Sequence, residues 1–259
     1  MKLRSLFWII MAWLLVLVVG CGGGGSADAP GGGGGGGEEI ASPVDPATAG
    51  KITGKVTFEG TALEPELIDM EAEPTCQEQY PDGAFTEKVM VNDNGTLQNV
   101  FVYVKEGLGD LKFPVPQEGV VLDQQGCRYR PHVFGVQVGQ ELIIRNSDGF
   151  LHNIHPMPTV NRAFNVGQAV NMDTTKNFSK VEVMIPIECD VHDWMSGYAG
   201  VVDHPYFAVT GSDGTFSLPN LPPGTYTLEA WHEEYGTQTM SVKVGEKESA
   251  TADFTFKGS

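Results

Sequence analysis

The segment 189–195, CDVHDWM, places three metal-binding side chains at regular three-residue spacing. They are the Cys189 thiol, the His192 imidazole and the Met195 thioether. A thiolate beside imidazoles selects soft or borderline metals such as copper or zinc. Apolar residues at 181–187 predict a strand directly before the segment, so all three side chains can point at one centre from a rigid strand end.

A second imidazole is available upstream, where His152 and His155 follow the apolar run 142–144. Two imidazoles, one thiolate and a weak axial thioether form the blue-copper ligand set, which holds both copper oxidation states with little rearrangement. From the residues alone, both histidines remain candidates. Zinc also remains a candidate, because one cysteine and two histidines can hold it with a water in the fourth place.

The elements that must position these side chains are predicted to be strands. Short apolar or alternating runs separated by Gly, Asn, Asp and Pro turns indicate an all-β sandwich or barrel. The clearest runs are 51–60, 88–104, 136–146, 181–187, 207–218 and 224–231. Within the folded part, only residues 63–73 have a composition compatible with a short helix.

Two longer stretches resemble the two halves of a small cupredoxin, in the order that the family requires. Residues 127–155 read CRYRPHVFGVQVGQELIIRNSDGFLHNIH, and residues 189–205 read CDVHDWMSGYAGVVDHP. The short Cys-x-x-His-x-x-Met loop is the amicyanin version of the motif. The resemblance implies a single type 1 copper ion held by His152, Cys189, His192 and Met195.

The same resemblance assigns supporting roles and a class of function. Asn153 would tie the two ligand loops together, and His155 would be a nearby polar residue. A dinuclear copper centre would need a second cysteine in the loop, and the loop has only one. A multicopper oxidase would need His-x-His pairs, and the sequence has none. We therefore expect a protein that transfers single electrons and is not an enzyme.

The C-terminal region resembles a carboxypeptidase regulatory-like, or transthyretin-like, domain. The motif begins at TGSDGTF, continues through LPPGTYTL and ends in a last strand, while its usual opening appears far upstream as ITGKVTFEGTAL. We therefore expect residues 51–116 and 206–259 to form one β-sandwich, with a Greek-key cupredoxin sandwich at 117–205 inserted in it or packed on it. Two domains in series are the alternative. The remaining histidines, His132, His204 and His232, are expected to be structural.

The N-terminus predicts export and a lipid anchor. Lys2 and Arg4 precede an apolar run that ends at Gly20, which is the layout of a signal peptide over residues 1–20. VVGC resembles a lipoprotein box, so Cys21 is expected to be lipidated and to anchor the chain to a membrane. An ordinary signal peptide cleaved among the glycines is the alternative. Residues 21–50 are glycine-rich and predict a flexible tether.

The predicted signal peptide and lipid anchor indicate where the protein is located. The protein is expected in the cell envelope, at the periplasmic face or the cell surface, and Gly22 favours the outer membrane. Cys76 and Cys127 are then left as an even pair, for which a disulfide is the simplest fate in an exported protein. Two free thiols, or an exchange with Cys189, remain open.

The chain carries a formal net charge of −17. Such a surface repels nucleic acid and favours a basic redox partner such as a cytochrome. The expected function is membrane-tethered, extracytoplasmic electron transfer by type 1 copper. The alternatives are a copper carrier or sensor and a cell-envelope β-module without redox activity.

Overall fold

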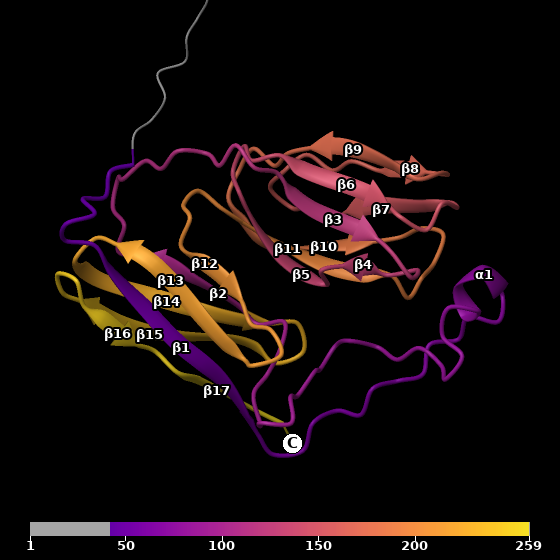
Figure 1. Cartoon of the computed structure of the whole chain (residues 1–259), viewed down its shortest axis with the longest axis horizontal. Coiled ribbons are helices and arrows are strands. Elements are labelled where there is room, and N and C mark those ends of the chain that lie inside the picture. The colour runs from indigo at the N-terminus through magenta and orange to yellow at the C-terminus, as the bar shows by residue number, and fades with distance from the viewer. Residues whose placement is uncertain (1–41, 259) are drawn as a thin grey trace, which may run out of the picture. The chain divides into compact units, whose positions relative to one another are not determined.

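The structure is a computed structural model that describes residues 42–258. These residues are almost entirely β, which confirms the all-β prediction (Figure 1). No helix in this part of the chain is both long and apolar enough to span a membrane. The predicted signal peptide 1–20, the Cys21 lipid anchor and most of the tether 21–50 lie outside the described residues.

Two sheets with a shared core form what we call the first sandwich. The first sheet has the order β13 (Thr215–Leu221), β1 (Gly50–Glu59) and β16 (Ser249–Thr251), with β17 (Phe254–Lys257) also paired to β1. The second sheet has the order β12 (Phe207–Val209), β2 (Phe101–Glu106), β14 (Gly224–His232) and β15 (Gly236–Val244). Side chains from both sheets, including Ile52, Val102 and Leu228, have no exposed surface.

The first sandwich is assembled from residues far apart in the sequence. Strand β1 pairs antiparallel with β13, placing Ile52 opposite Leu218, and parallel with β16 and β17. Strand β2 pairs antiparallel with both β12 and β14. That a separate domain at 117–205 is inserted between these strands stays a proposal, and these pairings support it.

Two further sheets form what we call the second sandwich. One sheet has the order β5 (Val133–Gln137), β11 (Ser196–Val202), β10 (Glu182–Glu188), β7 (His152–Pro156) and β8 (Val166–Gln168). The other has the order β4 (Tyr129–Arg130), β3 (Val120–Gln124), β6 (Leu142–Asn146) and β9 (Met172–Lys176). Both sheets contribute side chains to one core, in which Leu122, Ile144, Ile154 and Ile187 are fully buried.

Residues 61–88, which we call the excursion, leave the end of β1 and run to the second sandwich. The excursion contains the helix α1 (Pro74–Gln77), whereas residues 63–73 are not helical, so the helix predicted there was wrong. Proline suits the first helical position because its missing N–H has no partner there, and α1 accordingly begins at Pro74. A disulfide joins Cys76 in α1 to Cys127 of the second sandwich, and the Tyr80 hydroxyl donates to the Gly126 carbonyl at 2.6 Å.

Candidate metal centre

Three of the residues predicted to bind metal converge at one end of the second sandwich. His152 begins β7, Cys189 directly follows β10, and His192 lies in the loop before β11. Their ligand atoms all lie within 4.8 Å of one another. The Nδ1 atoms of His152 and His192 are 3.0 Å apart, and the Cys189 sulfur is 3.8 Å from His192 Nδ1. All three residues are at most 4% exposed.

The loop 189–195 is closed by its own backbone. The Cys189 amide donates to the Met195 carbonyl at 3.2 Å, and the Met195 amide donates to the His192 carbonyl at 3.0 Å. Met195 is 1% exposed and belongs to the core of the second sandwich. The predicted thioether is therefore held in the same buried loop as two of the converging residues.

His155 lies outside this cluster. Its Nδ1 forms a hydrogen bond with Asp190 Oδ1 at 3.1 Å, and its side chain is 37% exposed. It therefore occupies the position of a nearby polar residue, with a partner of its own.

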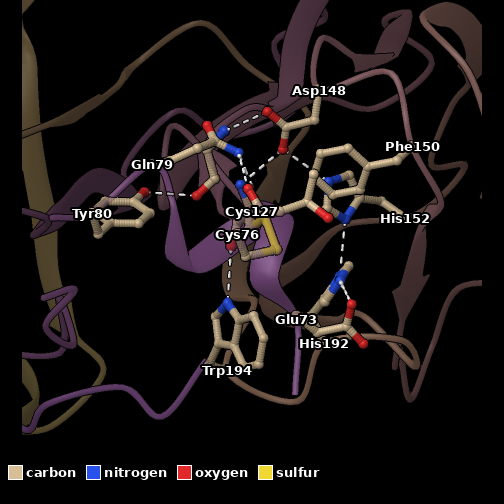
Figure 2. The surroundings of a disulfide bond; sticks show 12 residues. Glu73, Cys76, Gln79, Tyr80, Cys127, Asp148, Phe150, His152, His192 and Trp194 are labelled. Carbon is tan, nitrogen blue, oxygen red and sulfur yellow. Dashed lines mark hydrogen bonds and ion pairs between the residues drawn. A yellow bond between two sulfur atoms is a disulfide. The ribbon is translucent and has the colours of Figure 1, made fainter. Parts of the chain in front are cut away.

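Asp148 fixes the orientation of the His152 ring. The His152 Nε2–H donates to Asp148 Oδ2 at 2.8 Å, and the amides of Gly126 and Cys127 donate to the same carboxylate at 2.8 Å each (Figure 2). Burial raises the pKa of Asp148, but the hydrogen bonds from His152 and the two amides lower the pKa by a larger amount. The net shift is therefore downward. With its Nε2 held by Asp148, His152 presents its Nδ1 atom to the cluster.

The cluster also favours a thiolate. Burial raises the pKa of Cys189, but hydrogen bonds with His152 and His192 and with the backbone of Asn153 outweigh it and bring the pKa to about 6. Because a thiolate is the form that binds metal, the site is prepared for a cation at neutral pH.

Asn153 connects the two segments that carry the converging side chains. Its Oδ1 accepts from the Asp190 amide at 2.7 Å and lies 3.3 Å from the Cys189 sulfur. Its Nδ2 donates to Asp190 and to Asn165. These contacts join β7 to the start of the loop 189–195.

His192 is covered from solvent by three side chains. The ring centroids of Trp194 and Phe150 lie 5.2 Å and 6.4 Å from that of His192. The Glu73 carboxylate of the excursion approaches His192 Nε2 at 4.0 Å, as Figure 2 shows. His192 is only 2% exposed as a result. The Trp194 indole N–H donates to the Cys127 carbonyl at 3.1 Å, which ties this cover to the disulfide.

The donor set fits copper. Two nitrogens bound to one metal ion at about 2 Å each lie about 3 to 3.5 Å apart, which agrees with the 3.0 Å between the two Nδ1 atoms. Imidazole nitrogen, thiolate and thioether together match copper better than a metal that prefers oxygen ligands. His152, Cys189, His192 and Met195 would hold the ion.

The other buried histidines have partners elsewhere. His204 Nδ1 accepts from the Tyr206 amide, and burial lowers the pKa of His204. His232 Nδ1 accepts from the amides of Glu234 and Tyr235, and burial lowers the pKa of His232 to about 4.

Sequence reasoning did not identify the roles of Asp148, Glu73 and Tyr129. The Tyr129 hydroxyl shares its one hydrogen between the carbonyl oxygens of Asn153 and Glu188, and so connects β7 to the end of β10. Asp148 had a signal, because it lies four residues before His152, after the apolar run 142–144. Glu73 had none, since it is brought to His192 only by the path of the excursion.

Comparison with known proteins identifies one part of the chain by sequence. Residues 200–257 match the carboxypeptidase regulatory-like domain. This match confirms the resemblance inferred for the C-terminal region. The comparison with curated proteins found no match.

Similar solved structures include a copper-containing nitrite reductase and several amicyanins. The nitrite reductase, from Thermus scotoductus SA-01, is 18% identical with a TM-score of 0.32, over 37% of this chain and 24% of that chain. A reduced Cu(I) amicyanin variant is 21% identical with a TM-score of 0.30, over 34% of this chain and 85% of that chain. An oxidised amicyanin variant is 18% identical with a TM-score of 0.30, over 39% of this chain and 97% of that chain. The chain thus spans about a quarter of the length of the nitrite reductase.

Replacing Asp148 by Asn is expected to weaken metal binding about 10- to 100-fold, because residues that orient a ligand contribute affinity on that scale. A competition titration with a chelator measures this change. Asp173→Asn is the matched control, since it removes the same charge from an exposed carboxylate paired with Arg145. Equal affinities for the two variants would contradict the role of Asp148.

Proposed function

We propose that this protein is a membrane-tethered, extracytoplasmic copper protein that transfers single electrons between redox partners. The observation that carries the proposal is the buried donor set, in which two Nδ1 atoms 3.0 Å apart lie beside a thiol with a lowered pKa. Bound copper would supply a centre that alternates between Cu(I) and Cu(II).

The protein's own residues serve this task by resisting rearrangement. Asp148 holds the His152 ring, Asn153 holds the start of the loop, and the loop closes on its own backbone. A site that keeps its geometry in both oxidation states needs little reorganisation when an electron moves. Burial of the converging side chains also favours retention of the metal over its release to another protein.

The partner and the location are supported by charge and sequence. The net charge of −17 would steer a basic redox protein such as a cytochrome toward this surface. The basic and apolar leader, followed by Cys21 and a glycine-rich stretch, supports a lipid-anchored position in the cell envelope, with the outer membrane favoured.

The test is a spectroelectrochemical titration of the full chain loaded with Cu(II). We expect an intense visible band and narrow copper hyperfine splitting, with the band bleaching and returning in a reversible one-electron step. The same chain loaded with zinc is the colourless control. Loss of copper to a Cu(I) chelator on reduction would support a carrier instead, and a chain that binds only zinc, or no metal, would contradict the proposal.

A further inference from the structure

His132 forms a buried hydrogen-bonded link between the two sandwiches. Its Nε2 lies 2.6 Å from Glu233 Oε1, and its Nδ1 lies 3.0 Å from the Ser196 carbonyl oxygen. The side chains of His132 and Glu233 are each 8% exposed. A carbonyl oxygen only accepts, so His132 Nδ1 donates the hydrogen bond to Ser196.

These contacts run from the first sandwich to the end of the ligand loop. Glu233 lies in the turn between β14 and β15, within the region that matches the carboxypeptidase regulatory-like domain. Ser196 is the first residue of β11 and directly follows Met195. His132 therefore connects a turn of one sandwich to the residue next to the predicted axial ligand.

The two sandwiches pack closely enough to make this connection rigid. A Cβ atom on Gly135 of β5 would lie 2.3 Å from the Phe207 ring, and one on Gly200 of β11 would lie 2.4 Å from the Phe101 ring. No side chain fits at these two positions, so strands of the second sandwich lie directly against aromatic rings of the first. Glu233 is thus carried on a support that cannot easily shift.

Packing is less complete on the other side of the same loop. A cavity of about 210 Å³ is lined by His132, Met195 and Ser196, among other residues. The end of the loop therefore has room to move there, and the hydrogen bond from His132 opposes this movement together with the pairing of Ser196 with Glu188 and the loop's own backbone hydrogen bonds.

We propose that Glu233 acts through His132 as a positioning residue for the ligand loop, so that the regulatory-like domain sets the position of Met195. Its influence on the reduction potential rests on the proposed copper function. Its influence on the loop itself requires no metal.

The experiment compares Glu233→Ala with Glu234→Ala in the full chain. Glu234 is the matched control, because it is the exposed neighbour in the same turn and carries the same charge. In the metal-free protein, hydrogen exchange is measured at the amides of Cys189 and Met195, which close the loop. Exchange at these amides is expected to be about tenfold faster in Glu233→Ala, because opening of the loop costs less free energy, and unchanged in Glu234→Ala.

The copper-loaded variants supply the second readout. We expect the reduction potential and visible spectrum of Glu233→Ala to shift from those of the wild type, with a smaller or no shift in Glu234→Ala. Equal shifts in both variants would mean that the lost charge causes the shift, which would contradict positioning by Glu233. Unchanged hydrogen exchange in Glu233→Ala would also overturn the positioning role. If the wild type shows no type 1 spectrum, the proposed function fails, and the exchange rates alone decide this inference.

Discussion

Cu(II)-loaded Cys189→Ser protein is expected to lack the visible thiolate-to-copper band completely. Cys189 is the free thiol among residues 42–258, so the described part of the chain has no other sulfur anion to produce that band. Its pKa of about 6 makes it a thiolate at neutral pH, whereas a serine hydroxyl stays protonated. The visible and electron paramagnetic resonance spectra measure this loss.

Two controls test whether loss of the band comes from loss of the Cys189 sulfur and not from a change elsewhere in the protein. Val191→Ser changes a 40% exposed residue of the same loop and is expected to keep the band. Metal-free Cys189→Ser protein is expected to unfold close to the wild type, since the substitution keeps nearly the same volume. A variant that kept its blue colour would show that another residue supplies the thiolate, and our assignment of the site would be wrong.

Removing the Cys76–Cys127 disulfide is expected to lower the free energy of unfolding by about 4 kcal/mol. The disulfide closes a loop with a sequence separation of 51, and the chain-entropy relation gives about this value for such a loop. The double variant Cys76→Ser, Cys127→Ser is preferred, because a free Cys127 thiol beside Asp148 and His152 would create another metal-binding group. Denaturant titration of the metal-free protein measures the change.

The disulfide variant should also expose the candidate centre. The Cys127 amide donates to Asp148 and the Cys127 carbonyl accepts from Trp194, so loss of the disulfide loosens contacts on both converging imidazoles. We expect faster modification of His192 by an imidazole-specific reagent. Wild-type protein treated with a reductant should behave like the double variant. An unchanged unfolding midpoint would mean that the other contacts of the excursion hold it in place.

The sequence allowed prediction of the strands and of the ligand loop, because both depend on local patterns. Alternation around Ile52 and Val56 marks β1, and the three-residue spacing from Cys189 to Met195 lies within one loop. The pairing of β1 with β13 was predictable only from the regulatory-like motif, whose opening ITGKVTFEGTAL lies far upstream of its continuation at TGSDGTF.

The support around the site could not be predicted in this way. Glu73 and His192 are separated by more than a hundred residues, and the excursion that joins them has no repeating apolar pattern. His132 was expected to be structural, but its partners Ser196 and Glu233 follow from how the two sandwiches pack. The helix was misplaced because the charged residues before Pro74 resemble a helical composition, whereas proline sets where the short helix begins.

The long-range pairing of β1 has a consequence for the order in which the chain folds. The strands of the second sandwich, from Val120 to Val202, form one continuous stretch, so this sandwich can fold as soon as that stretch has been synthesised. Strand β1 is made earlier than this stretch, yet its partners β13, β16 and β17 are made only after it. Because such distant contacts form slowly, we expect the second sandwich to fold first, leaving β1 unpaired until β13, β16 and β17 have been synthesised.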